Sequence, residues 1–398
     1  MKILVANLGS TSFKYRLYDL GDPSEPLLAR GAVERIGSDS AGIMLSSAKG
    51  EFEMVAPVLD HGAAVQLCLS QLTSPDFGVI GAADDVAAIG FKAVHARQLS
   101  GVHRVDESVL DAMESYAEVA PAHNPPYVKA MRMLHARFPK LPLVAAFETG
   151  FHQTIPEAQS RYAVPDEWAT KYGIKRWGFH GASHCYIAGR MAELLGTNDA
   201  RIISCHLGGS SSLCAIRGGK SVATSLGMSP QSGLPHNNRV GDFDVFALPA
   251  IMAETDLTLS EILDTLATKS GLQGISGFND LRDIEKAADL GNSQSTLALE
   301  MFIASIRHYL GAYLLELGGA DAIVFTGGIG ENSARIRAGV CRDLGWFGIE
   351  MDWMKNSTGE GERTISAPSS RVQLWCVPTN EEIVVARQAR DLLSGKGA

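Results

Sequence analysis

Four glycine-rich segments carry most of the side chains that could handle a phosphate group. They combine glycine with serine, threonine, histidine or lysine, and they are residues 7–14, 178–184, 206–212 and 326–332. Three of them follow a short apolar run, at 3–6, 201–204 and 322–325. A glycine-rich turn after a strand lets the backbone approach a ligand closely. The pattern predicts phosphate-binding turns at the ends of strands.

The first of these segments has the residue types that phosphoryl transfer needs. That reaction depends on donors and cations held around the moving group more than on covalent help. Asn7, Ser10, Ser12 and Lys14 lie on one turn and supply polar donors and a point charge.

Two further residues stand out, but neither is diagnostic alone. His180 lies between glycines, and no glutamate follows it, so the segment is not a zinc-protease motif. A single histidine between glycines has a structural role as often as a functional one. Arg239 precedes the acidic turn at 241–244, and a single arginine near acids most often forms a surface ion pair.

Two segments of the chain resemble each other. Residues 3–20 and 202–219 both consist of an apolar run, a Leu-Gly turn rich in serine, and a second strand-like run. A turn followed at once by a strand predicts a β-hairpin, whereas a Rossmann fingerprint or a P-loop leads into a helix. The likeness indicates an internal duplication of a hairpin-led α/β domain. A chance similarity between two short turns is the alternative.

Helical periodicity separates the strand-like runs. It is clearest at 128–137, 184–195 and 295–318. Alternating strands and helices predict an α/β architecture. A chain of 398 residues is too long for one ordinary core, so we expect two or three domains.

Composition narrows the class of protein. The chain is 45% hydrophobic and 20% charged, which excludes a disordered protein, and its net charge of −9 argues against nucleic acid as the main partner. No apolar run approaches the roughly 20 residues of a membrane span, and the first residues indicate a strand rather than a signal peptide. Six scattered cysteines predict reduced, mostly buried thiols in a cytoplasmic protein rather than a zinc site or a disulfide framework.

The chain resembles the acetate kinase (acetate/propionate kinase) family nearly end to end. The matching stretches follow the family order, and they are 7–14, 123–126, 151–157, 178–184, 224–230, 239–244, 326–337 and 378–382. The resemblance implies two duplicated ribonuclease H-like domains of the actin and sugar kinase type, with the active site in a cleft between them. It also implies ATP or ADP as co-substrate, Mg²⁺ or Mn²⁺, and reversible phosphoryl transfer to the carboxylate of a short-chain acid.

The resemblance also divides the chain. It implies an N-terminal domain over 1–150, completed by a C-terminal helix at 383–398, and a second domain over 151–382. The partners that it implies are a small carboxylate and an adenine nucleotide, without nucleic acid or membrane, usually in a homodimer.

Residue roles follow from the matching motifs. The resemblance implies four catalytic residues, His180, Arg239, Glu148 and Lys92. It assigns Asn7 and Glu381 to the metal, with Glu382 as an alternative. The implied nucleotide residues are Ser10, Ser12, Lys14, His206, Gly208, Asp280, Arg282, Gly327, Gly328 and Ile329. The implied acid-binding residues are Lys92, Ala93, Ala122, Phe179 and Pro230. We expect His184 to be a structural hydrogen-bonding residue.

This sequence departs from the usual family pattern at several of these positions. Lys92 stands where relatives usually have arginine, and Glu148 where they have aspartate. Lysine keeps the charge but loses the bidentate fork, while glutamate extends the acid by one methylene, so we expect the two exchanges to compensate each other. Ala122 and Ala93 stand where leucine and valine are common, which predicts room for propionate as well as acetate.

Two other functions share this pattern. One is a kinase of the same fold acting on a longer or substituted carboxylic acid. The other is a nucleotide-binding regulator without turnover, which the retained Asn7, His180, Arg239 and Glu381 disfavour.

Overall fold

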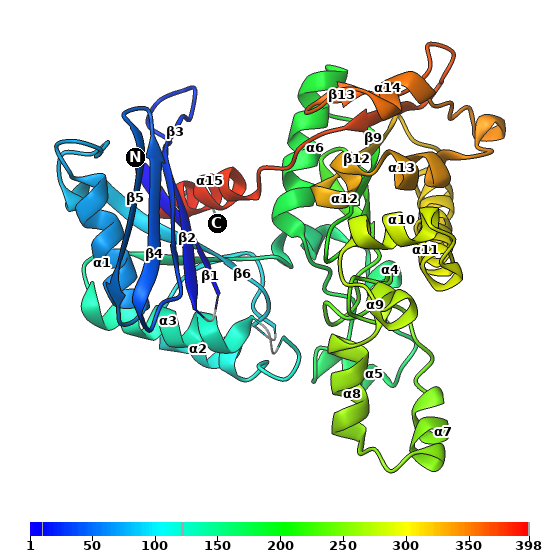
Figure 1. Cartoon of the computed structure of the whole chain (residues 1–398), viewed down its shortest axis with the longest axis horizontal. Coiled ribbons are helices and arrows are strands. Elements are labelled where there is room, and N and C mark those ends of the chain that lie inside the picture. The colour runs from blue at the N-terminus through cyan, green and yellow to red at the C-terminus, as the bar shows by residue number, and fades with distance from the viewer. Residues whose placement is uncertain (10, 97, 121–122, 397–398) are drawn as a thin grey trace. The chain divides into compact units, whose positions relative to one another are not determined.

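The computed structural model of the chain describes residues 1–9, 11–96, 98–120 and 123–396. It forms two compact units (Figure 1). The first contains Met1–Gly150 together with Asn380–Ala398, and the second contains Phe151–Thr379. The last segment of the chain therefore belongs to the first unit.

A mixed sheet organises the first unit. Its strand order is β5-β4-β3-β2-β1-β6-β8-β7. The strands are β1 (Lys2–Leu8), β2 (Ser12–Asp19), β3 (Leu27–Glu34), β4 (Ser38–Ser47), β5 (Gly50–Val58), β6 (Val86–Ala93), β7 (Val102–Arg104) and β8 (Leu143–Phe147). β1 to β5 form an antiparallel meander, while β1, β6 and β8 are parallel.

Helices cover both faces of this sheet. They are α1 (His61–Leu72), α2 (Glu107–Glu114), α3 (Asn124–Arg137) and α15 (Glu381–Leu393), with a 3₁₀ turn at Ala83–Asp85. Alternate strand residues such as Leu4 and Phe13 pack against Val65 of α1 and Met131 of α3 in one apolar core. α15 packs against β1, β6 and β8. Its Val385 lies against Gly90, where a Cβ would come within 3.0 Å, so it covers the other face.

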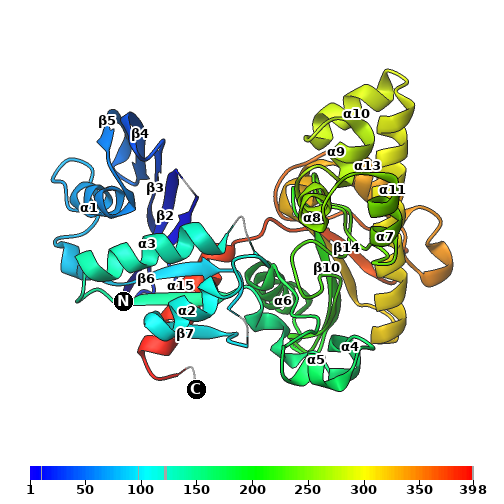
Figure 2. The ribbon, with the colours of Figure 1, turned by 90° about the horizontal axis from the view of Figure 1, so that it is seen from below.

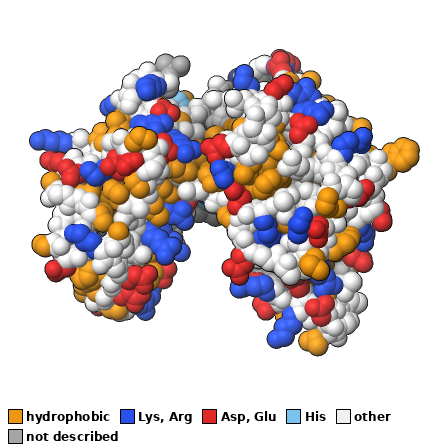
Figure 3. Space-filling model, turned by 90° about the horizontal axis from the view of Figure 1, so that it is seen from above, with side chains coloured by type: hydrophobic (Ala, Val, Ile, Leu, Met, Phe, Trp, Pro, Cys, Tyr) orange, Lys and Arg blue, Asp and Glu red, His pale blue; other side chains and the backbone are white. Residues whose placement is uncertain are grey.

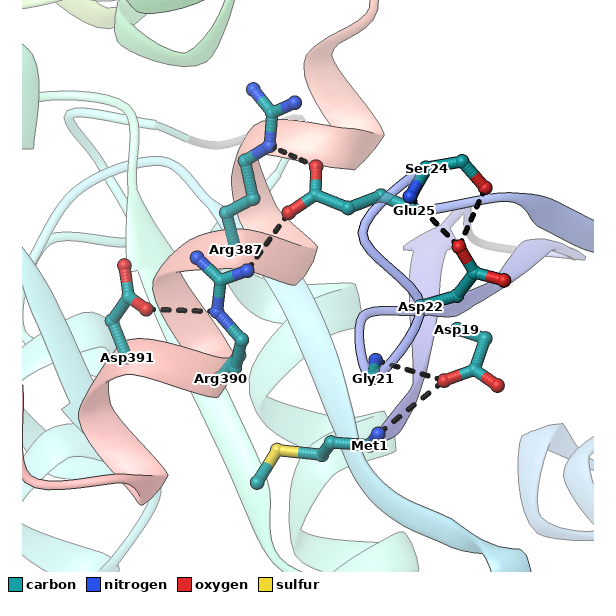
Figure 4. Close-up of polar contacts among 9 residues, drawn as sticks. All are labelled: Met1, Asp19, Gly21, Asp22, Ser24, Glu25, Arg387, Arg390 and Asp391. Atoms are coloured by element: carbon teal, nitrogen blue, oxygen red, sulfur yellow. Dashed lines mark hydrogen bonds and ion pairs between the residues drawn. The ribbon is translucent and has the colours of Figure 1, made fainter.

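Charged contacts fix α15 to the loop between β2 and β3 (Figure 4). Glu25 accepts hydrogen bonds from Arg387 Nε at 2.6 Å and from Arg390 Nη1 at 2.8 Å. Arg390 also pairs with Asp391. The Glu25 side chain is only 17% exposed, so this bidentate contact is partly shielded from water and links the two ends of the unit.

A second mixed sheet organises the second unit, in the order β11-β10-β9-β12-β14-β13. The strands are β9 (Arg201–His206), β10 (Ser212–Arg217), β11 (Lys220–Thr224), β12 (Ala322–Thr326), β13 (Arg363–Thr364) and β14 (Gln373–Cys376). β9, β12 and β14 are parallel, and β10 runs antiparallel to β9.

Two long helices sandwich this sheet (Figure 2). α6 (Gly181–Leu195) packs Ile187 against Ile202 and its neighbours, whereas α11 (Ser293–Leu317) packs Phe302 against Ile203 on the opposite face. The shorter helices are α4 (Glu157–Ser160), α5 (Asp166–Thr170), α7 (Ala247–Glu254), α8 (Leu259–Thr268), α9 (Gly271–Ser276), α10 (Leu281–Asp289), α12 (Gly327–Asn332), α13 (Ala334–Cys341) and α14 (Trp353–Ser357). 3₁₀ turns occur at Gly150–Thr154 and Gly345–Phe347.

The two units repeat one construction. Each contains an antiparallel hairpin, β1-β2 or β9-β10, whose first strand has a parallel neighbour on its other side. The sequence prediction of an α/β fold with two similarly built domains is confirmed. The three predicted helical patterns are also confirmed, as α3, α6 and α11.

The state of the cysteines and the mixture of charges on the surface are those of an ordinary globular protein. All six cysteines lie among the described residues, none is in a disulfide, and all except Cys185 are buried. Within the part of the chain that the structure describes, no helix has the length and apolar character that crossing a bilayer requires. On the face drawn in Figure 3, acidic and basic side chains are interspersed on both units.

Candidate active site

Four polar side chains gather at one edge of the first unit's sheet. Asn7, Lys92 and Glu148 lie at or just after the carboxyl ends of β1, β6 and β8. These parallel neighbours end at the same edge, which is where ligands of α/β sheets usually bind. Glu381 reaches the edge from the first turn of α15, whose N-terminus is capped by the side chain of Asn380.

An ion pair between Lys92 Nζ and Glu381 Oε2 dominates the electrostatics of this edge. The two side chains are 29% and 13% exposed, and Glu148 is buried. Burial disfavours the charged form of Lys92, but attraction to Glu381 and then to Glu148 outweighs it, so the pKa of Lys92 is raised. The ammonium group therefore stays charged and offsets the repulsion between the two carboxylates.

Tyr127 of α3 orients Asn7, a role that the sequence did not indicate. Its Oη donates a hydrogen bond to Asn7 Oδ1 at 3.1 Å and accepts one from the Leu8 N–H at 3.3 Å. Burial raises the pKa of Tyr127, so the hydroxyl keeps its proton. The only available signal was that Tyr127 directly follows the matching segment 123–126.

Glu381 and Glu382 face different partners. Glu381 pairs with Lys92, whereas Glu382 lies 3.2 Å from Arg16 Nη1 on β2. Of the two adjacent acids, Glu381 is therefore the one in contact with the polar edge residues.

The first turn places two of its predicted phosphate-binding residues, Ser12 and Lys14, on the strand that pairs with β1. Lys14 lies directly opposite Asn7 in the β1-β2 hairpin, so the two side chains share a face. Its Nζ is 3.9 Å from Glu34. Ser12 begins β2, and Ser10 lies outside the described residues.

The residues predicted to contact the acid have dissimilar surroundings. Ala93 is fully buried in the core that contains α1 and α3. Since neighbouring strand residues point to opposite faces, Ala93 points away from the face of Lys92, and its contact with the acid stays a prediction. Ala122 lies outside the described residues. In the second unit, Phe179 is buried, and the Pro230 carbonyl accepts a hydrogen bond from Arg239 Nη1 at 2.7 Å.

A cavity of about 630 Å³ lies in the second unit. It is bordered by the turn after β9, the start of α10 and the helix α12. Five of the predicted nucleotide residues line it, namely Gly208, Asp280, Arg282, Gly328 and Ile329. Six residues outside that prediction also line it, namely Gly209, Asn237, Leu281, Glu285, Asn332 and Ser333. The structure therefore brings these three segments and Asn237, from a fourth, together around one space.

Gly327 lets α12 begin against the end of β9. Its φ is +77°, and a Cβ there would lie 2.7 Å from the Leu207 carbonyl oxygen. Its N–H donates to Glu331 Oε1 at 3.0 Å, and the Ile329 N–H donates to the Leu207 carbonyl at 2.8 Å. A side chain at position 327 would push this turn away from the strand.

Asp280 and Arg282 form a fixed pair at the rim of the cavity. Asp280 caps α10 by accepting from the Arg282 N–H at 2.9 Å, and its carboxylate pairs with Arg282 Nη2 at 2.5 Å. The hydrogen bond from the guanidinium, together with that backbone bond, lowers the pKa of Asp280 to about 2. Because the Arg282 side chain is 88% exposed, a flat ligand could stack on it.

Two histidine rings stack beside the β9-β10 turn. His180 and His206 have ring centroids 4.3 Å apart and planes 25° apart. His206 ends β9, and its Nδ1 is 2.8 Å from Ser183 Oγ. His180 is the N-cap of α6, where its φ is +55°. This left-handed conformation is unusual for a residue other than glycine, and it sets the direction of the imidazole.

The loop that carries Arg239 is anchored to the same turn. The Asn237 N–H donates to the Gly209 carbonyl at 3.1 Å. The buried His236 accepts from the Ser211 N–H at 3.0 Å. Burial lowers the pKa of His236 to about 3, aided by the nearby charge of Arg239. The neutral ring is thus a rigid link between this loop and the turn.

The donors at the first unit's edge suit a hard divalent cation that is also held by substrate phosphates. Among the described residues, no group of three or more His, Cys, Asp or Glu side chains could by itself hold a metal ion. The amide oxygen of Asn7 and the carboxylate of Glu381 are oxygen ligands, and Lys92 already places a cation against Glu381. Mg²⁺ is usually bound by one or two carboxylates plus substrate phosphates rather than by an all-protein cage, so this set fits it.

A duplicated, hairpin-led α/β fold with a cavity beside a glycine-rich turn defines a nucleotide-dependent phosphotransferase. The chain matches the Acetokinase family over residues 2–387. It is 40% identical to the acetate kinase of Carboxydothermus hydrogenoformans over 400 residues, covering 100% of both chains. It is 42% identical to the propionate kinase of Citrobacter rodentium over 390 residues, covering 97% of this chain and 95% of that one. The crystal structure of Porphyromonas gingivalis acetate kinase is similar with a TM-score of 0.88 at 37% identity, covering 98% of this chain and 99% of that one. The chain belongs to the Acetokinase family, and it is a kinase that phosphorylates a carboxylate.

Proposed function

We propose that this chain transfers the γ-phosphoryl group of ATP reversibly to the carboxylate of acetate or propionate, giving ADP and an acyl phosphate. A carboxylate oxygen forms the new bond to the γ-phosphorus. The bond from that phosphorus to the β–γ bridging oxygen breaks, and its electron pair stays with ADP. The observation that carries the proposal is the cavity that gathers Gly208, Asp280 and Gly328 from three distant segments.

The second unit holds the nucleotide in this proposal. The purine lies in the cavity, with the Arg282 guanidinium against one face and the backbone at Gly328 and Ile329 close by. His206 meets the phosphates. His180 donates a hydrogen bond to the oxygens of the transferring group, and Arg239 forms a charge-assisted fork to them.

The first unit binds the remaining charges. Lys92 serves as a point charge for the acid's carboxylate, and Glu148 fixes the direction of Lys92. Asn7 and Glu381 hold Mg²⁺ or Mn²⁺. When bound, such a cation neutralises charge on the phosphate oxygens. Ser12 and Lys14 bind those phosphates, and the family resemblance gives Ser10 the same role.

A hydroxamate trap for acyl phosphate tests this function directly. The chain is incubated with ATP, Mg²⁺ and hydroxylamine together with acetate, propionate, butyrate or a substituted acid. We expect product with acetate and propionate. Product only with longer or substituted acids would mean that those acids, and not acetate or propionate, are the substrates. No product with any acid would contradict the proposal.

We further propose a homodimer that uses an exposed apolar surface of the second unit. α7, α8 and their flanks expose large apolar side chains, including Val245 (64%), Phe246 (82%) and Leu263 (49%). Contiguous exposed apolar residues mark interaction sites more often than free surface. Light scattering after gel filtration should give a dimer mass, and Phe246→Lys should shift it toward the monomer. A monomeric unaltered chain would contradict this proposal.

We also propose a cytoplasmic location. Five of the six thiols are buried and none is in a disulfide, which suits a reducing compartment. Fractionation of cells expressing the tagged chain tests this, and recovery from an oxidising compartment would contradict it.

A further inference from the structure

A chain of buried side chains leads from the core of the second unit to His180. His180 Nδ1 is 2.8 Å from Ser212 Oγ, and the same hydroxyl is 2.8 Å from His184 Nε2. His184 Nδ1 is in turn 2.9 Å from Ser204 Oγ. Ser204, His184 and Ser212 are fully buried, so these groups exchange hydrogen bonds with one another rather than with bulk water.

The protons in this chain are coupled. Burial, followed by the neighbouring His152 and His206, lowers the pKa of His184 well below its usual range. A neutral imidazole carries one N–H, and a serine hydroxyl carries one proton. Ser212 can therefore donate to only one of its two histidine neighbours and must accept from the other. Whichever nitrogen of His184 is protonated thus decides which nitrogen of His180 is protonated.

The backbone before His180 is held in place by His152. His152 Nε2 lies 2.9 Å from the Phe179 carbonyl oxygen, and since a carbonyl only accepts, that nitrogen carries the proton of His152. Gly178 has a φ of +72°, and a Cβ there would lie 2.6 Å from the His152 ring. With the backbone fixed on one side and Nδ1 bonded on the other, the imidazole of His180 has one orientation.

We propose that Ser212, supported by His184 and Ser204, is a positioning residue that holds His180 in the tautomer with its proton on Nε2. Ser204 donates to His184 Nδ1, His184 Nε2–H donates to Ser212, and Ser212 donates to His180 Nδ1. This inference rests on the proposed function, in which His180 donates to the transferring phosphoryl group. The opposite arrangement would place a lone pair on Nε2 of a neutral ring, which would repel phosphate oxygens.

The stacked ring of His206 favours the same arrangement. Two imidazoles 4.3 Å apart are poorly placed to be positively charged together, since like charges at that distance disfavour each other. A neutral His180 can donate to a phosphate only through a protonated Nε2. A hydrogen bond that Nδ1 accepts leaves the proton of a neutral ring on Nε2, because the bond at one ring nitrogen sets the state of the other.

Histidine tautomers can be measured without turnover. The full chain is labelled with ¹⁵N-histidine, and long-range ¹H–¹⁵N spectra report which ring nitrogen of His180 is protonated, with assignment from His180→Asn. We expect the Nε2–H form in the unaltered chain and a mixture of forms in Ser212→Ala. Ser212→Thr keeps the hydroxyl and should retain the Nε2–H form. Ser276→Ala is the matched control, because Ser276 is also buried but its hydroxyl donates to the Leu272 carbonyl at 2.7 Å rather than to a histidine.

Kinetics provide the second measurement. Ser212→Ala should lower kcat about 10- to 100-fold with KM for ATP changed less than about threefold, as for loss of a transition-state contact. Ser212→Thr should recover most of kcat. An Nδ1–H form of His180 in the unaltered chain, or an Nε2–H form that persists in Ser212→Ala with full kcat, would overturn the proposal. If His180→Ala itself retains kcat, the assigned function of His180 fails, and the tautomer spectra still judge Ser212 separately.

Discussion

Lys92 and Glu381 form an ion pair across a sequence separation of 289 residues. One lies on β6 and the other on the first turn of α15. The lysine that replaces the family's usual arginine thus contacts the carboxylate that we assign to the metal, with the buried Glu148 as a second negative neighbour. A single ammonium group therefore lies between the sides of this edge that we propose bind the acid and the metal.

The first prediction concerns that shared charge. Lys92→Arg and Glu148→Asp should each lower kcat/KM for the acid, and the double variant should recover much of it. The reason is that both glutamates attract the same lysine, and groups in contact usually couple by roughly 0.5–3 kcal/mol. A double-mutant cycle on kcat/KM measures this, and strictly additive losses would show that the exchanges are independent.

The second prediction concerns His180. His180→Ala should lower kcat about 10²–10³-fold and raise KM for ATP much less, because its contact forms mainly in the transition state. Steady-state kinetics with ATP and acetate measure both constants. His308→Ala, at an exposed histidine of α11, is the control and should leave them unchanged. A nearly unaltered kcat in His180→Ala would remove this residue from the mechanism.

The third prediction concerns stability at acidic pH. Burial lowers the pKa of His236 to about 3 and that of His152 to about 4. Between those values and the ordinary pKa near 6.5, the unfolded chain binds protons that the folded chain does not. The contribution of these two histidines to the unfolding free energy is therefore complete above about pH 6.5. It is lost as the pH falls, and at pH 5 the loss is about 2 kcal/mol for each histidine.

Urea unfolding at pH 7, 6 and 5 measures this loss. His236→Gln should flatten the dependence of the unfolding free energy on pH, even if it lowers stability at pH 7. An equal slope in both proteins would mean that His236 does not become protonated on unfolding as we expect.

The fourth prediction concerns Arg337, which is 1% exposed and whose hydrogen-bond acceptors among the described residues include no carboxylate. It donates to the carbonyls of Gly330 and Glu331 at the end of α12, and to Asn356. Arg337→Met leaves these buried acceptors unpaired, so the unfolding free energy should fall by about 2–4 kcal/mol. Because α12 borders the cavity that we propose holds the nucleotide, KM for ATP should also rise.

Arg335→Met is the matched control for Arg337. Arg335 is two residues away and pairs with Asp289 at the surface, with side chains 42% and 72% exposed. Surface pairs of this kind contribute about 0–1 kcal/mol. Equal losses of stability in the two variants would contradict the role given to the buried arginine.

The fifth prediction concerns the acid's chain length. Ala122 stands where a larger side chain is common, so kcat/KM for propionate should at least equal that for acetate. Burying one methylene contributes ~0.8 kcal/mol, and such pockets discriminate by about 1–3 kcal/mol. Ala122→Leu should shift the ratio toward acetate. A steep preference for acetate, or a ratio unchanged by Ala122→Leu, would contradict a wider pocket.

The predicted fold followed from patterns that are local in the chain. Both hairpins were evident because a glycine- and serine-rich turn lies between two strand-like runs, and β9 and β10 meet with Ser212 opposite His206. The predicted C-terminal helix at 383–398 is observed as Glu381–Leu393. Its earlier start reflects capping by Asn380, a contact that sequence periodicity does not reveal.

Much of the candidate site depends on contacts between distant residues, which the sequence could not provide. The motif residues Gly208, Asp280 and Gly328 were found, but Asn237 beside them was not, because no local pattern distinguishes it. Ser212 looked like one serine among several. Its importance comes from lying between two histidines of another element. The acid-binding role of Ala93, inferred because valine is common at its position, stays a prediction, since Ala93 lies in the buried core and a strand sends adjacent side chains to opposite faces.

The contact between Glu25 and α15 has a consequence for biosynthesis. The first sheet leaves the ribosome early, yet the helix that covers its β1-β6-β8 face is translated only after the whole second unit. Domains generally fold in the order of synthesis, so here the nascent second unit completes its core first, while the first waits with an uncovered apolar face. During that interval the emerging polypeptide is a natural client for chaperones that bind exposed strands. A stop codon before Arg387 should leave the first unit open to proteases while sparing the second.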